Sequence, residues 1–177
     1  MDDLDISVYA DESELIKVTV EDAIEYVRDT LEAKGVCHLS LTGGTVGIAT
    51  AKAMGEIFNS GEWSGLHIWF SDERFVPYDS NDRNDLEISK ILSPESGVIL
   101  HRVAGSGAIE VAAKSFADEL KNVDMDLIIL GMGPDGHVAS LFPENIHADE
   151  RRDAFEVIDS PKSPAQRVTF SLKKLNQ

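Results

Sequence analysis

Short apolar runs alternate with segments of helical periodicity along this chain, and this alternation constrains its fold more than any other feature. Apolar residues recur at helical spacing between Leu15 and Leu31, and Gly35 ends that pattern. The run Val36–Leu41 that follows is typical of a buried strand. Strands that alternate with helices favour an α/β layered domain with a largely parallel sheet flanked by helices.

The same patterns predict the remaining elements. We expect a short first strand at 6–9, a helix at 45–58, a strand at 66–70, helices at 85–92 and 108–120, a strand at 125–130, and shorter strands at 154–158 and 168–170. The chain has 177 residues, which is long enough for a real hydrophobic core. We therefore expect one α/β domain over residues 1–177.

The charge of the chain is strongly negative but unevenly spread. A net charge of −16 argues against nucleic acid or an anionic membrane as a partner. Residues 151–177 nevertheless carry six basic side chains against three acidic ones. This basic segment is either a solvated surface or the place where an acidic protein gathers positive charge to bind an anionic metabolite.

The location of the protein is predicted from the N-terminus and from cysteine usage. The first residues, Met1–Asp5, are acidic and lack the basic and apolar regions of a secretory signal. No apolar run approaches the length that spans a membrane. The single cysteine, Cys37, cannot form an internal disulfide, and we interpret it as a small core residue. A reducing cytoplasm fits these features.

A glycine-rich segment follows the predicted strand at 125–130 and carries the strongest functional pattern. Residues 130–143 read L-G-M-G-P-D-G-H-V-A-S-L-F-P. Ligands of open α/β sheets bind at the carboxyl ends of the strands. A histidine there, His137, with Asp135 two residues before it, is a candidate general base, because an imidazole with a pKa near ~6.5 can accept a proton at neutral pH.

Two other interpretations of this segment exist. Its glycines form the spacing G-x-G-x-x-G, which suggests a dinucleotide site. Pro134 lacks the N–H that would hold a pyrophosphate, Asp135 would repel it, and Pro143 leaves no room for the long helix of that motif. A plain glycine turn with a surface histidine stays open.

A glycine pair precedes the predicted helix at 45–58. In Thr42-Gly43-Gly44-Thr45, backbone N–H groups at a helix N-terminus can bind a phosphate. Thr45 could cap the helix or donate its hydroxyl to the ligand. Many α/β turns carry such a pair for geometry alone, so this signal is weak by itself.

Two further segments place cations near predicted strands. The segment S-D-E-R-F-V-P at 71–77 follows a strand, and the Arg74 guanidinium could bind a phosphate or carboxylate, or pair with Asp72 or Glu73. In S-P-K-S-P-A-Q-R-V-T at 160–169, two prolines stiffen a loop with Lys162 and Arg167. That loop suits a second anion clamp and equally a rigid surface turn.

In this order, the four segments resemble 6-phosphogluconolactonase over nearly the whole chain, and the G-M-G-P-D-G-H-V-A-S-L-F-P block is the specific part. The resemblance implies hydrolysis of 6-phosphogluconolactone, a phosphorylated sugar lactone, to 6-phosphogluconate in the oxidative pentose phosphate pathway, without a metal or organic cofactor. It also implies the fold of glucosamine-6-phosphate deaminase and ribose-5-phosphate isomerase. The implied catalytic residues are His137 as base and Asp135; the implied substrate-binding residues are Gly43, Gly44, Thr45, Asp72, Arg74, Lys162 and Arg167.

The chain departs from the family pattern in two places. The family's glycine loop more often reads S-G-G-S-T, so phosphate contacts here would depend more on the backbone and Thr45. Family members also usually continue beyond the R-V-T segment, so we expect a further strand and helices to be missing after Gln177, where this sequence stops.

Two other functions compete with lactone hydrolysis. In the related deaminase or isomerase chemistry, Asp72 would abstract a proton next to a carbonyl and His137 would assist ring opening. The deaminase resemblance calls for an Asn-Glu-Pro segment after the histidine, whereas residues 140–143 here read S-L-F-P. A non-catalytic sugar-phosphate binder would keep the glycine loop and Arg74 without needing His137. No feature of the sequence indicates an oligomeric state.

Overall fold

Two β-sheets organise the computed structural model, which describes residues 5–147 and 149–177. The larger sheet has four parallel strands in the order β4-β2-β1-β5, with bounds β1 Cys37–Leu41, β2 Leu66–Phe70, β4 Ile99–Leu100 and β5 Leu127–Ile128. The smaller sheet has three antiparallel strands in the order β3-β7-β6, with bounds β3 Asp72–Arg74, β6 Ala154–Val157 and β7 Arg167–Phe170.

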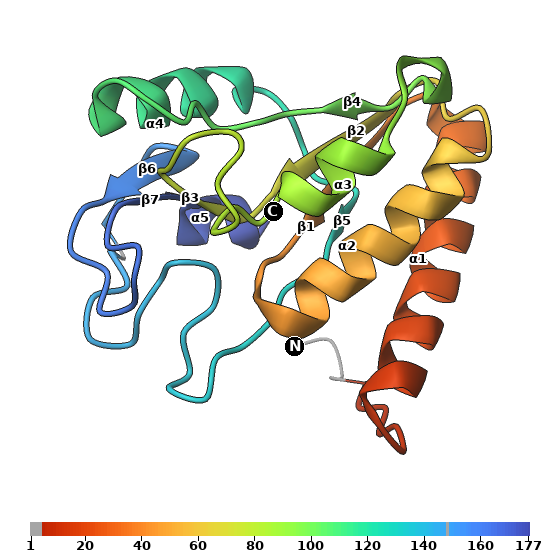
Figure 1. Cartoon of the computed structure of the whole chain (residues 1–177), viewed down its shortest axis with the longest axis horizontal. Coiled ribbons are helices and arrows are strands. Elements are labelled where there is room, and N and C mark those ends of the chain that lie inside the picture. Colours follow the sequence, from red (N-terminus) through yellow and green to blue (C-terminus); the bar gives the residue numbers. More distant parts are fainter. Residues whose placement is uncertain (1–4, 148) are drawn as a thin grey trace.

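Helices cover both sheets. Their bounds are α1 Glu12–Lys34, α2 Gly44–Asn59, α3 Leu86–Ile91, α4 Ile109–Glu119 and α5 Leu172–Leu175, with a 3-10 turn at Pro94–Ser96. Helices α1 and α2 lie side by side along the larger sheet, and α4 lies near the smaller sheet at the other end of the molecule (Figure 1). The fold class expected from the sequence, a parallel sheet flanked by helices, is confirmed.

The larger sheet buries apolar side chains against α1 and α2. Leu39 of β1 and Ile68 of β2 are fully buried in this core, together with Val27 of α1 and Met54 of α2. Alternate residues of a strand point to opposite faces of a sheet, so the intervening side chains of β1 and β2 lie on the other face. There Trp69 packs in a second core with Phe116 of α4 and Phe170 of β7.

Three histidines gather around Trp69 on this second face. His67 Nδ1 lies 2.9 Å from His101 Nε2, and the indole N–H of Trp69 donates to Nδ1 of His38 at 3.2 Å. The rings of Trp69 and His101 stack with centroids 3.5 Å apart. Burial lowers the pKa of each of these imidazoles, because desolvation disfavours the charged form. We refer to His38, His67 and His101 as the histidine cluster.

Ser71 joins the two sheets. Strand β2 ends at Phe70 and β3 begins at Asp72, so the same extended segment belongs first to the parallel sheet and then to the antiparallel one. The Ser71 N–H donates to the Leu41 carbonyl of the parallel sheet at 2.9 Å, and its own carbonyl accepts from Phe170 N at 2.7 Å. This junction brings Asp72 to the carboxyl edge of the larger sheet.

The sequence predictions of the long elements are confirmed, and three details differ. The strand predicted at 6–9 is wrong: Ile6 and Val8 are 73% and 90% exposed and pair with no strand of the described chain. Strand β5 covers only two of the six residues predicted. Strands β3 and β4 and helix α5 were not anticipated.

The structure also bears on possible membrane spans and on the surroundings of Cys37. Within residues 5–147 and 149–177, no helix is both long and apolar enough to span a membrane. Cys37 is fully buried, as expected for a small core residue. Burial raises the pKa of its thiol to about 12, which keeps the thiol protonated near neutral pH.

Candidate active site

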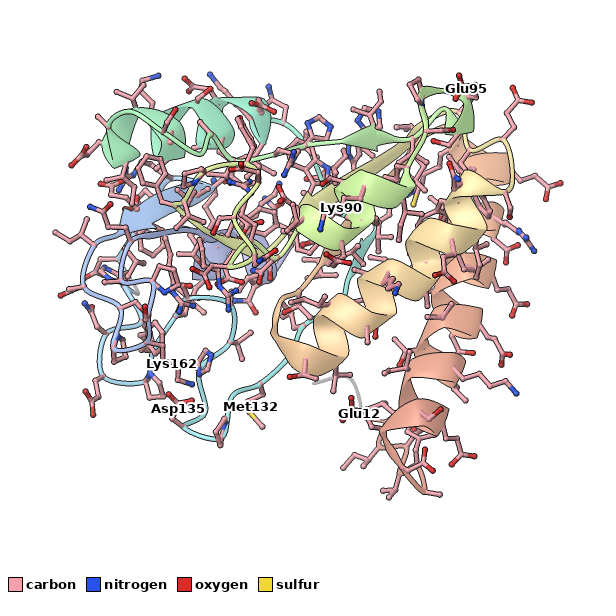
Figure 2. All side chains as sticks on the ribbon, viewed as in Figure 1. Glu12, Lys90, Glu95, Met132, Asp135 and Lys162 are labelled. Carbon is pink, nitrogen blue, oxygen red and sulfur yellow. The ribbon has the colours of Figure 1, made fainter. Side chains whose placement is uncertain are left out.

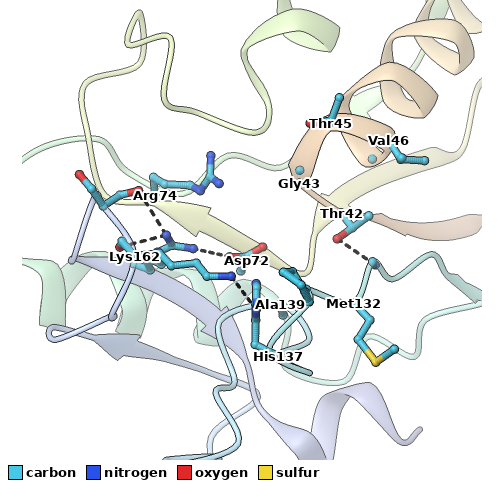
Figure 3. A pocket seen from close by; sticks show the side chains of 17 residues that line it. Thr42, Gly43, Thr45, Val46, Asp72, Arg74, Met132, His137, Ala139 and Lys162 are labelled. Carbon is cyan, nitrogen blue, oxygen red and sulfur yellow. Dashed lines mark hydrogen bonds and ion pairs between the residues drawn. The ribbon is translucent and has the colours of Figure 1, made fainter. Parts of the chain in front are cut away.

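A pocket of about 410 Å³ opens at the carboxyl ends of β1, β2 and β5 (Figure 3). Every site residue predicted from the sequence except Asp135 lines it. The full lining is Thr42, Gly43, Gly44, Thr45, Val46, Gly47, Asp72, Arg74, Gly131, Met132, Gly133, Pro134, His137, Ala139, Lys162, Ser163 and Arg167.

The imidazole of His137 is held by the turn that precedes it. Nδ1 lies 2.5 Å from Oδ1 of Asp135, and the ring stacks on Phe142 with centroids 4.9 Å apart. The ring also fits closely over Gly133, where a Cβ atom would lie 2.0 Å from Cε1 of the imidazole. With 17% of its side chain exposed, His137 is a pocket residue rather than a surface histidine.

The charge of Asp135 fixes the role of each imidazole nitrogen. The hydrogen bond from His137, followed by that from Lys162, lowers the pKa of Asp135 to about 2, so its carboxylate is ionised at neutral pH. A carboxylate only accepts hydrogen bonds, so the Nδ1 atom of His137 carries the proton. In the neutral ring, Nε2 is then the basic nitrogen, and no hydrogen bond to it occurs within the described residues.

Lys162 completes this charged group from the other side of the pocket. Its Nζ atom lies 3.1 Å from Oδ1 of Asp135 and 3.2 Å from Nδ1 of His137. Figure 2 shows Lys162 and Asp135 at the same end of the molecule, near Met132. Residues from two distant loops, 133–137 and 160–166, therefore meet at the histidine.

The glycine pair stands at the N-terminus of α2. The helix begins at Gly44 with Gly43 as its N-cap, and no side chain caps it. Of the two roles predicted for Thr45, capping is therefore wrong, and donation of its hydroxyl to a ligand stays a prediction. Thr45 lies in the first turn because the helix starts one residue earlier than predicted. The initial N–H groups of a helix lack partners within the helix, and this first turn has no acidic residue, so it suits an anion.

Thr42 connects the two glycine segments. Its hydroxyl oxygen accepts a hydrogen bond from the Gly131 N–H at 3.3 Å, shown dashed in Figure 3. The loop after β1 is thereby tied to the loop after β5. Thr42 thus has a structural contact of its own.

Asp72 lies buried in the pocket wall with its carboxylate already bound. Oδ2 accepts from the Ser140 hydroxyl at 2.6 Å and lies 3.7 Å from Nη1 of Arg167. Oδ1 lies 3.4 Å from Nδ2 of Asn84. This network rigidly orients the side chain at the edge of the pocket.

Arg74 does not form the alternative ion pair with Asp72 or Glu73. Within the described chain no ion pair joins it to Asp72 or Glu73; its Nη1 instead donates to the carbonyl of Asp82 at 2.6 Å. The Glu73 carboxylate accepts from backbone N–H groups, including that of Arg74 itself. The guanidinium Nε is buried without a partner in the described residues, so Arg74 retains donors on the pocket wall.

Arg167 lines the pocket, but most of its N–H donors bind other groups of the protein. Nε donates to the Pro164 carbonyl at 3.0 Å and Nη2 to the Lys162 carbonyl at 3.1 Å. Arg167 is 3% exposed, and burial lowers its pKa. Arg167 therefore holds the loop that carries Lys162 in addition to facing the pocket.

Three residues that shape the pocket were not identified from the sequence as site residues: Thr42, Asn84 and Ser140. Ser140 lies within the specific motif and could have been found there. Asn84 lies in a polar segment, 79–85, that shows no periodicity, so its burial has no signal in the sequence. A dinucleotide site at residues 131–136 is excluded, because that motif needs a helix after the glycine loop and no helix occurs between α4 and α5 within the described residues. Within residues 5–147 and 149–177, no group of three or more His, Cys, Asp or Glu side chains is arranged so that it could hold a metal ion.

Comparisons with known proteins agree with this geometry. Residues 10–177 match the family model described as glucosamine-6-phosphate isomerases/6-phosphogluconolactonase. The 6-phosphogluconolactonase of Thermotoga maritima is 32% identical over 96% of this chain and 78% of its own, and that of Mycobacterium bovis is 29% identical over 97% and 76%. The crystal structure of the Thermotoga maritima protein superposes with a TM-score of 0.78, over 90% of this chain and 74% of that one. The chain thus spans about three quarters of the length of these relatives, and it belongs to the glucosamine-6-phosphate isomerase/6-phosphogluconolactonase family.

Proposed function

We propose that this chain hydrolyses 6-phosphogluconolactone to 6-phosphogluconate in the oxidative pentose phosphate pathway. The observation that carries the proposal is the placement of His137, oriented by an ionised Asp135, in a pocket that also contains a helix N-terminus and the cations Arg74, Lys162 and Arg167. The names of the relatives point to the same reaction. The reaction breaks one ester C–O bond of a phosphorylated substrate. It therefore needs a base, an oxyanion site and a phosphate site.

The proposed base is Nε2 of His137. It accepts a proton from water while the water oxygen bonds to the lactone carbonyl carbon, and the carbonyl oxygen becomes an oxyanion. The ring C–O bond then breaks, and the proton passes from the imidazolium to the departing ring oxygen. A positioned base of this kind contributes roughly 10²–10⁴-fold to the rate.

The oxyanion and the phosphate each need donors. The N–H groups of residues 43–45 lie at the pocket wall, where they can bind negative charge. The N–H groups of Gly131, Gly133 and Gly136 already donate to Thr42, His137 and Gly133. We assign the phosphate to Gly43, Gly44 and Thr45 with Arg74, supported by Lys162 and Arg167. Local cations are required, because the chain as a whole carries a charge of −16 and repels anions.

Deaminase or isomerase chemistry is disfavoured by the positions after His137, which read S-L-F-P and lack a carboxylate. At Asp72, Oδ2 accepts from Ser140 and faces Arg167, which leaves Oδ1 as the one oxygen that could act as a base. A non-catalytic binder would not need the hydrogen-bonded pair of Asp135 and His137.

Proton release from freshly prepared 6-phosphogluconolactone tests the proposal. The purified protein should accelerate release above the spontaneous rate, and EDTA should leave that acceleration unchanged. Release of ammonia from glucosamine 6-phosphate without lactone hydrolysis would instead support the deaminase. Loss of activity in EDTA would refute the metal-free mechanism. We also propose a cytoplasmic location, with the phosphorylated lactone as the partner rather than nucleic acid or a membrane.

A further inference from the structure

Asn84 lies behind the pocket between two of its walls. It is 1% exposed and comes from the segment between β3 and α3. On one side its carboxamide meets Asp72, and on the other it meets Gly43; both of these residues line the pocket (Figure 3). Asn84 itself does not line the pocket, so it acts on a ligand only through these neighbours.

The contact with Asp72 is made by hydrogen bonds. Nδ2 of Asn84 donates to the Asp72 carbonyl at 2.9 Å and lies 3.4 Å from Oδ1 of its carboxylate. The Asn84 N–H also donates to Oε1 of Glu73 at 2.8 Å. The side chain and the backbone of Asn84 are thus both attached to β3.

The contact with Gly43 is made by packing. A Cβ atom on Gly43 would lie 2.2 Å from Oδ1 and 2.5 Å from Cγ of Asn84, so the carboxamide occupies the space that any other residue at 43 would need. Oδ1 is buried and accepts no hydrogen bond within the described residues. The orientation of the amide is therefore set by its Nδ2 donors, and Oδ1, Cγ and Nδ2 all lie within 2.6 Å of where a Cβ on Gly43 would be.

We propose that Asn84 is a positioning residue that sets the separation between Asp72 and the N-terminus of α2. Gly43 is the N-cap of α2, so a shift of Asn84 moves the first N–H groups of that helix relative to the pocket wall that holds Asp72 and Arg167. The inference rests on the proposed function, because it assigns those N–H groups to the phosphate of the lactone. Asn84 thereby determines how tightly the phosphate is held.

The first test compares two Asn→Asp substitutions in the same loop. Asn84→Asp keeps the shape but replaces the Nδ2 donor by a carboxylate beside that of Asp72. KM for 6-phosphogluconolactone should rise about 10-fold or more, with kcat reduced less than threefold, because a phosphate is held equally in the ground and transition states. Asn81→Asp, at an exposed position, adds the same charge and should change KM less than twofold. An unchanged KM in Asn84→Asp, or an equal rise in Asn81→Asp, overturns the proposal.

A double-mutant cycle decides the case even if Asn84→Asp folds poorly. Gly43→Ala alone forces a Cβ into the Asn84 carboxamide, whereas Asn84→Ala removes the atoms that it would strike. In the double variant, the rise in the Kd of inorganic phosphate, measured by calorimetry, should be no larger than in Gly43→Ala alone. Two rises that simply multiply would show that the residues act independently and would overturn the proposal.

The two proposals fail separately. A wild-type protein that binds phosphate with the expected coupling but leaves the lactone intact refutes the proposed hydrolysis alone. A wild-type protein that hydrolyses the lactone but shows no coupling between Gly43 and Asn84 refutes the role of Asn84 alone.

Discussion

The Nζ atom of Lys162 lies 3.2 Å from the Nδ1 atom of His137. Both groups also contact Oδ1 of Asp135, so the cation balances the carboxylate that orients the imidazole. In the mechanism we propose, the loop at 160–166 is therefore part of the catalytic arrangement as well as a source of positive charge for the phosphate.

Removing the Lys162 cation should impair both substrate binding and the chemical step. Lys162→Met loses the charge-assisted hydrogen bond to Asp135 and a cation that lines the pocket. We expect kcat/KM to fall about 10-fold, with contributions from both kcat and KM. Steady-state kinetics on the phosphorylated lactone measure the split, and Lys162→Arg should recover part of the loss. A change confined to KM would reduce Lys162 to a phosphate ligand.

Replacing the proposed base should affect the chemical step selectively. His137→Ala and His137→Asn should each lower kcat by about 10²-fold or more and leave KM within about threefold, because a general base acts chiefly in the transition state. Proton-release assays above the spontaneous background measure both constants. A near-normal kcat in either variant would remove His137 from the mechanism.

The two arginines should discriminate between phosphorylated and unphosphorylated substrates. Arg74→Ala should lower kcat/KM for 6-phosphogluconolactone about 10–150-fold, mostly through KM, and should change hydrolysis of unphosphorylated gluconolactone little. Equal proportional losses on the two lactones would contradict the phosphate assignment.

Arg167→Ala provides an instructive comparison with Arg74→Ala. Because Arg167 donates to the carbonyls of Pro164 and Lys162, its removal should also lower the unfolding midpoint, whereas Arg74→Ala should lower it less. Thermal unfolding of both variants beside the kinetic comparison separates the two roles. An unchanged midpoint in Arg167→Ala would show that its carbonyl contacts do not hold the loop.

The histidine cluster should make folding stability depend on pH. The folded pKa values of His38, His67 and His101 lie below the unfolded value near ~6.5, so the fold favours neutral imidazoles. This stabilisation is complete above about pH 6.5 and is lost as the pH falls through the lowered folded values. The facing charges are Glu119 beside His101, and Asp126 and Lys174 around His38.

Urea unfolding at pH 7.5 and pH 5.5 measures this dependence. The free energy of unfolding should fall between the two pH values, and His67→Gln should make that fall smaller. His147→Gln removes one imidazole that packs on Phe155 outside the cluster and serves as the control. An identical fall in wild type and His67→Gln would show that the cluster does not titrate in this range.

The long helices and the central strands could be predicted because each has a periodic apolar face. Helix α1 shows Val20, Ile24 and Val27 at helical spacing, and all three are buried. The antiparallel sheet could not be predicted in the same way. Its strand β3 consists of the charged residues Asp72–Arg74, of which Asp72 and Glu73 are buried because their partners come from elsewhere in the chain.

The site shows the same division. His137 and the glycine loops were found because they follow apolar strands, at the edge where α/β sheets bind ligands. Ser140 lies within the specific motif, but its contact with Asp72, 68 residues away, has no signal in the sequence. Asn84 was not found, because it lies in a polar segment without periodicity. The capping role considered for Thr45 is wrong because the helix starts at Gly44, a one-residue difference that no side-chain pattern marks.

The junction at Ser71 bears on the order in which the site can be assembled during synthesis. Among the described strands, β3, which carries Asp72, pairs only with β7, in which Thr169 lies opposite Asp72. A nascent chain still lacking β7 can therefore form the parallel sheet and the glycine loop from local segments, while Asp72 has no neighbouring strand. Contacts between segments so distant along the chain form late, because a long loop must close first. The binding surface is consequently acquired in two stages, and Asp72 takes its place in it only after β7 has been translated.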